Sequence, residues 1–85
     1  MSTVSEEQKV AAVHRLSVMS ERHPELARRV ADARLELGAA ILAMDAVDER
    51  IQAGEEIHSL QEQAAVELAK NAHAQAFADL LRGEH

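Results

Sequence analysis

The sequence has no cysteine, no tryptophan and no tyrosine, and it has a single phenylalanine, Phe77. Without thiols, disulfide frameworks, thiolate zinc sites and thiol redox chemistry are excluded. With one aromatic ring, nucleic-acid bases have no aromatic platform on which to stack. No apolar run is long enough to span a bilayer, and no apolar leader follows Met1, so we expect no membrane association and a cytoplasmic location.

Residues that break helices are also scarce, since 85 residues include one proline and three glycines. The sequence therefore predicts an all-α protein with very short connections. We predict a single helical domain over residues 1–85, with helices at about 6–22, 24–53 and 55–82.

Local signals mark the ends of these helices. Ser5 and Gln8 form an S-x-x-Q capping-box pattern before the first apolar run. Pro24 disfavours helix at the residue before it and suits the first position of the next helix. Gly83 follows the last apolar positions and is expected to stop the third helix.

Large apolar residues are few, although the apolar content is 47%. Seventeen of these residues are alanine, and only 23 are Val, Ile, Leu, Met or Phe. Alanine favours helix but buries little surface. A short chain with so little to bury is marginal alone, so we expect a homo-oligomer or a helical protein partner.

The second helix carries two apolar stripes. Its main stripe alternates steps of three and four residues, as a heptad seam does: Val30, Ala33, Leu37, Ala40, Met44, Val47 and Ile51. A second stripe consists of Ala31, Leu35, Ala39, Leu42 and Ala46, bordered by Gly38. A helix with two apolar faces needs two neighbours.

The third helix also shows two faces. Its expected main stripe is Ile57, Leu60, Ala64 and Leu68, and its second face is Val66, Ala69, His73, Ala76 and Leu80, with Phe77 at the edge. We predict that the main stripes pack within the chain and that the second faces form a partner interface. That interface would comprise Leu35, Gly38, Ala39, Leu42, Val66, Ala69, His73, Phe77 and Leu80.

Gly54 is either a turn or a weak point in one long rod. Continuing the heptad beyond Ile51 would place Gly54 and His58 on the seam, whereas the next apolar stripe begins at Ile57 and is rotated. The change of phase favours a tight reversal and an antiparallel helical hairpin, preceded by a short N-terminal helix.

Charge is unevenly distributed along the chain. The net charge is −6, which argues against nucleic acid and anionic membranes as partners. Residues 1–43 are balanced, whereas residues 44–85 have three basic and nine acidic side chains, concentrated around Gly54. This acidic turn could be solvated, could receive a basic partner, or could hold a cation.

The second helix opposes its own macrodipole. Basic side chains lie towards its start (Arg28, Arg29 and Arg34) and acidic ones towards its end (Asp45, Asp48 and Glu49). The macrodipole favours the reverse order, so a different use for these charges is expected.

Four residues near the turn could bind a metal. A carboxylate on one helix, Glu49, and a Glu-x-x-His on the next, Glu55 to His58, resemble the ligand arrangement of ferritin-like di-metal bundles. Glu62 falls on the same side of the third helix. The resemblance implies iron, manganese or zinc, with the ligand set completed by dimerisation. Without that site we expect no cofactor.

No hydrolase triad or phosphate-binding loop is present in the sequence. We therefore expect a small acidic interaction protein that is not an enzyme, an adaptor or small chaperone that pairs its second apolar face with itself or with a partner helix. By analogy of class alone, small acidic helical chaperones of bacterial secretion systems have this size and shape. The alternative function is a metal-binding ferritin-like half-bundle.

Overall fold

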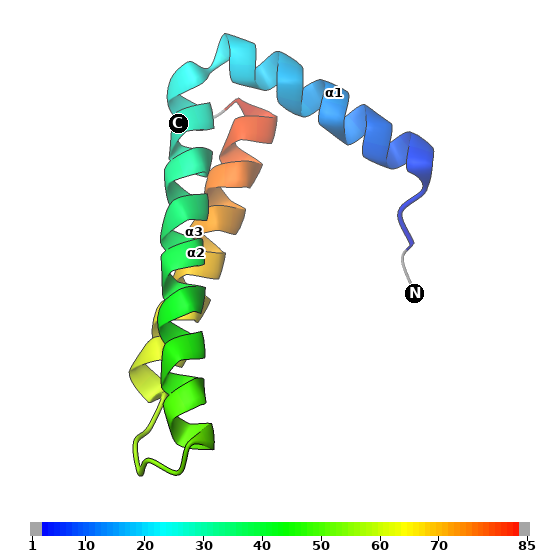
Figure 1. Cartoon of the computed structure of the whole chain (residues 1–85). Coiled ribbons are helices and arrows are strands. Elements are labelled where there is room, and N and C mark those ends of the chain that lie inside the picture. The colour runs from blue at the N-terminus through cyan, green and yellow to red at the C-terminus, as the bar shows by residue number, and fades with distance from the viewer. Residues whose placement is uncertain (1–2, 84–85) are drawn as a thin grey trace.

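The computed structural model describes residues 3–83, and within them the chain forms three α-helices and no strand. Helix α1 spans Glu6–Arg22, α2 spans Pro24–Gln52 and α3 spans Leu60–Arg82. The two longer helices, α2 and α3, run side by side in opposite directions, and α1 leaves one end of this pair at an angle (Figure 1). The predicted all-α hairpin with a leading N-terminal helix is confirmed.

The predicted signals at the start of α1 and at the end of α3 act as expected. The backbone N–H of Gln8 donates to Ser5 Oγ at 3.2 Å, and the N–H of Ser5 donates to Gln8 Oε1 at 2.9 Å, which completes the capping box. Gly83 adopts φ +71° directly after α3. This left-handed conformation favours glycine and ends the helix.

A single residue, His23, separates α1 from α2. Its N–H donates to Met19 O at 2.8 Å, and its own carbonyl accepts from Ala27 N at 3.0 Å. Pro24 occupies the first turn of α2, where its missing N–H removes no helical hydrogen bond. The bend between the helices therefore preserves almost all of the backbone hydrogen bonding on both sides.

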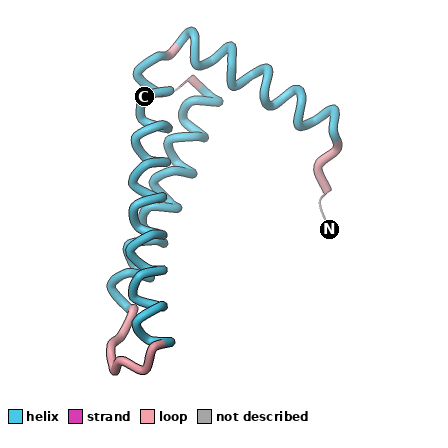
Figure 2. The backbone as a smooth tube through the Cα atoms, viewed as in Figure 1, coloured by secondary structure: helices cyan, strands magenta, loops and turns pink. Residues whose placement is uncertain are grey.

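The connection between α2 and α3 is a loop over residues 53–59, not the tight turn expected at Gly54 (Figure 2). Gly54 does end the second helix with a positive φ of +96°. Helix α3 then begins at Leu60, five residues later than predicted. Ser59 and Glu62 form an S-x-x-E pattern at this start, and Ser59 is the N-cap residue of α3. The Ser59 side chain makes no capping hydrogen bond, and its Oγ accepts instead from Gln63 Nε2 at 2.7 Å.

The face of α3 that packs against α2 is the one expected to point outward. Val66 and Leu80 are buried, at 5% and 1% exposure, whereas Leu60 and Leu68 are each 71% exposed. The buried face repeats at alternating steps of four and three residues along the whole helix, whereas the exposed stripe ends after Leu68 because Asn71 and Gln75 follow it. The longer stripe buries more surface against the long helix α2.

The core lies where the three helices meet. Met19 of α1, Leu26 and Val30 of α2 and Leu80 of α3 form one buried cluster. Arg15 of α1 donates from Nε to the carbonyl of Leu81 at 2.9 Å. A cation at this end of α3 satisfies a free carbonyl and complements the helix dipole. The open end of the hairpin is thereby held to α1.

The chain is thin and extended for its length. Its Cα extents are 49 × 32 × 13 Å, and its radius of gyration is 16.7 Å. A compact domain of this size has a radius of gyration of about 12 Å. The exposed surface is 6612 Å², against about 5,000 Å² for a folded monomer of similar mass. The helices thus form a single layer, with a surplus of about 1,600 Å² of exposed surface.

Candidate interaction surface

Helix α2 presents its second apolar stripe to solvent. We call this surface the outer stripe, and it consists of Ala31, Leu35, Gly38, Ala39, Leu42 and Ala46. Leu35 and Leu42 are 73% and 71% exposed. At about 100° per residue, the outer stripe lies on the side of α2 opposite the residues that contact α3. The half of the predicted partner interface that lies on α2 is therefore accessible.

The other half of the predicted interface is not accessible. Val66 and Leu80 lie inside the hairpin, and Ala69, His73 and Phe77 are partly buried on the same face of α3. These five residues pack within the chain because they continue the long stripe that contacts α2. The apolar residues that α3 presents outward are instead Leu60, Ala64 and Leu68.

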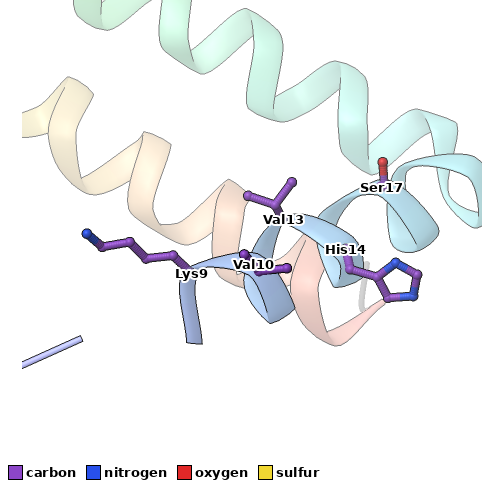
Figure 3. A pocket seen from close by; sticks show the side chains of 5 residues that line it. All are labelled: Lys9, Val10, Val13, His14 and Ser17. Carbon is purple, nitrogen blue, oxygen red and sulfur yellow. The ribbon is translucent and has the colours of Figure 1, made fainter. Parts of the chain in front are cut away.

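A third apolar surface lies on α1, outside the predicted partner interface. Val10 and Val13 are 67% and 66% exposed. Figure 3 shows them between Lys9 and His14, with Ser17 one turn further on, along a shallow surface depression. The i, i+3 spacing of the two valines was the available signal.

The acidic turn contains one well-formed ion pair. Arg50 donates from Nε to Glu55 Oε2 at 3.0 Å and from Nη2 to Glu55 Oε1 at 2.9 Å. This hydrogen bonding lowers the pKa of the Glu55 carboxyl and raises the pKa of Arg50. The single basic residue of the turn thereby neutralises one of its carboxylates and ties the loop back to α2.

The four candidate metal ligands do not share one helical face. Glu49 is exposed on α2, and Glu55 and His58 lie in the loop, outside any helix. Glu62 lies in the first turn of α3 and is partly buried. Among residues 3–83, no group of three or more His, Asp or Glu side chains could hold a metal ion. The helical Glu-x-x-His arrangement was wrong because α3 starts after His58.

Two polar atoms are buried between α2 and α3 without a hydrogen-bond partner among the described residues. They are Oε2 of Glu62 and Nε2 of His73. The His73 ring lies beside Phe77, with centroids 6.2 Å apart. Glu62 and His73 are eleven positions apart in α3, which corresponds to a rise of about 16 Å along the helix. They are two separate defects of the helix contact and do not form one site.

Comparison of the chain with protein-family models, curated proteins and solved structures gives no significant match. Within residues 3–83, no helix combines the length and apolarity needed to cross a bilayer.

Proposed function

We propose that this protein is a non-enzymatic helical interaction protein, an adaptor or small chaperone whose exposed apolar stripes pair with another helical chain. The exposed leucines of α2 and α3 carry the proposal, together with a surplus of about 1,600 Å² of total exposed surface. Monomeric proteins rarely leave large contiguous apolar patches in water, and such patches mark interaction sites.

The character of the exposed residues supports a helical partner. Leucines on two helices, Leu35 and Leu42 on α2 and Leu60 and Leu68 on α3, are each more than 70% exposed. Each pair is separated by seven or eight residues, about two helical turns. A row of apolar residues at this spacing fits the apolar face of another helix. The surrounding acidic side chains keep the chain soluble until it pairs.

Site-specific photo-crosslinking in the cells that produce the protein tests this function. A photoreactive residue at position 35 should give an adduct of defined mass, because the outer stripe is covered by another chain. The same residue at position 36, about 100° further round α2, replaces an exposed Glu36 and serves as the control. It should give no adduct or a much weaker one.

Absence of a specific adduct at position 35 and also at position 68 would contradict the proposed function. The mass of the adduct identifies the class of partner. Twice the chain mass indicates a second copy, and any other mass indicates a different protein.

A further inference from the structure

The outer stripe of α2 is symmetric about its own midpoint. That midpoint falls between Gly38 and Ala39, and Leu35 and Leu42 lie equally far on either side of it. Ala31 and Ala46 form the next equidistant pair. At about 100° per residue all of them lie within about 50° of one line along α2. Two such stripes in opposite directions match residue for residue.

We propose that the occupant of this stripe is a second copy of the chain, which docks antiparallel on α2 about a two-fold axis level with Gly38 and Ala39. This inference rests on the proposed function and names its partner. A two-fold interface uses the same patch on both subunits, so that patch must be complementary to itself. The two stripes overlap along their whole length only if the two-fold axis passes between positions 38 and 39.

Charge complementarity supports the antiparallel direction. Arg28 and Glu49 are the next equidistant pair at the ends of the stripe, so Arg28 of one copy lies level with Glu49 of the other. Neither side chain has an ion pair among residues 3–83. A parallel dimer would instead bring like charges together at both ends, which is unfavourable.

The same pairing accounts for the charge order that opposes the macrodipole of α2. Basic side chains near the start of the helix and acidic side chains near its end are unfavourable within one chain. In the antiparallel dimer, the start of each α2 lies against the end of the other. The unfavourable order within a helix becomes favourable between helices, and it occurs twice because of the two-fold axis.

Small residues at the axis allow the two helices to approach closely. A Cβ added to Gly38 would meet no atom within 4 Å, so no other part of the chain occupies this space. Ala39 adds only a methyl group beside it. Helices with small residues at the contact reach axial distances near 8 Å. Leu35 and Leu42, one turn away on either side, then fill the interface around this close approach.

The chain exposes more surface than a compact monomer of its mass, by an amount comparable with a dimer interface. Each partner of a standard interface buries about 800 Å². The surplus surface of the chain is about 1,600 Å², twice that amount. An interface of standard size would therefore remove about half of the surplus.

A charge-reversal cycle tests the pairing in the full chain by sedimentation equilibrium. Arg28→Glu and Glu49→Arg should each weaken the dimer about tenfold, because each places two like-charge pairs in the interface. The double variant should return to within about threefold of the wild type. Within one helix, positions 28 and 49 are about 32 Å apart, so such rescue cannot arise inside one chain.

The cycle separates dimer pairing from an effect on the helix itself. Reversing either charge improves its interaction with the macrodipole of α2, so a role confined to one chain predicts that both single variants are more stable. Circular dichroism of each variant shows whether the helices are intact. Weakened association with unchanged helix content supports the pairing, and unchanged association in all three variants overturns it.

Cysteine crosslinking tests the direction and the register, because the chain has no other thiol. Ala39→Cys should form a disulfide with itself under oxidation. Leu35→Cys alone should not, because the two copies of position 35 are offset by about 10 Å along the axis, beyond the roughly 7 Å Cα limit for a disulfide. A mixture of Leu35→Cys and Leu42→Cys should form the mixed disulfide.

The possible results separate the two proposals. Efficient self-crosslinking of Leu35→Cys and of Leu42→Cys alone indicates a parallel dimer and overturns the antiparallel pairing, while the proposed function stands. A monomeric wild type at micromolar concentration also overturns the pairing. The adduct at position 35 then decides whether pairing with a different protein still supports the proposed function.

Discussion

The two apolar faces of α2 lie in opposite environments. On the face towards α3, Val30 and Ala33 are 6% and 8% exposed, whereas on the outer stripe Leu35 and Leu42 are 73% and 71% exposed. The outer stripe carries two leucines among alanines and a glycine, whereas the inner stripe has five bulky residues: Val30, Leu37, Met44, Val47 and Ile51. Apolar periodicity thus identifies a face that avoids water, but the length and position of the neighbouring helix decide which face is covered within the chain.

The largest loss of stability is expected when a residue on the buried face of α3 is truncated. Leu80→Ala should lower the free energy of unfolding by about 2–4 kcal/mol, because it leaves a cavity in the three-helix cluster. Leu68→Ala on the same helix, 71% exposed, is the matched control and should change it by less than about 0.5 kcal/mol. Urea unfolding followed by circular dichroism measures both. Equal losses would show that the inner and outer faces of α3 are not distinct.

Gly54 and Gly83 both have a positive φ, but only Gly83 is surrounded by other side chains. A Cβ at Gly83 would lie 2.8 Å from Met19 Cε and 2.9 Å from His23 Nε2, whereas at Gly54 it would meet nothing within 4 Å. Backbone strain alone costs alanine about 1 kcal/mol at either position. The contacts with Met19 and His23 should bring the loss of unfolding free energy for Gly83→Ala to about 2 kcal/mol, measured by thermal unfolding. A larger loss at Gly54 would contradict the packing of the junction.

His73 is a polar residue on the inner side, and its removal should strengthen the contact between α2 and α3. His73→Leu should raise the free energy of unfolding by about 1 kcal/mol, since it removes a buried nitrogen without a partner among the described residues. His14→Leu, at an exposed position on α1, is the control and should give no gain. A loss of stability in His73→Leu would mean that Nε2 has a partner in solution.

The smallest effect is expected in the loop. Hydrogen bonding to Arg50 lowers the pKa of Glu55 in the folded chain, so the ion pair stabilises the fold above the ordinary pKa of a glutamate carboxyl. That contribution is lost as the pH falls through the lowered pKa. Glu55→Gln should therefore melt slightly lower than the wild type at neutral pH and like it in acid. The same difference at both pH values would contradict an ionic origin.

The elements of the fold were predictable because their signals are local. The Ser5 capping box, Pro24 and Gly83 act through neighbouring backbone groups, and each is confirmed. The start of α3 was missed although the S-x-x-E pattern from Ser59 to Glu62 indicates it. The change of apolar phase after Ile51 indicates a reversal near Gly54 but not the length of the connection.

The candidate site was predictable only in part because it depends on tertiary packing. The prediction that the outer stripe of α2 lies on the surface agrees with the structure. Helix α2 is uninterrupted over Pro24–Gln52, so the angle between its two apolar stripes follows from the sequence alone. The partner face of α3 was inverted, because a loop of seven residues leaves the rotation of α3 free to follow the longer stripe. The helical Glu-x-x-His arrangement is absent for a different reason: α3 begins at Leu60, so Glu55 and His58 lie in the loop.

The mass of the wild-type chain in solution, compared with that of Leu42→Asp, shows whether a second copy covers the outer stripe of α2. Sedimentation equilibrium at micromolar concentration should give twice the chain mass for the wild type. Leu42→Asp should be monomeric with unchanged helix content, because it places two unpaired charges in the interface. A monomeric wild type, or a Leu42→Asp dimer as tight as the wild type, would contradict the claim that a second copy covers the outer stripe of α2.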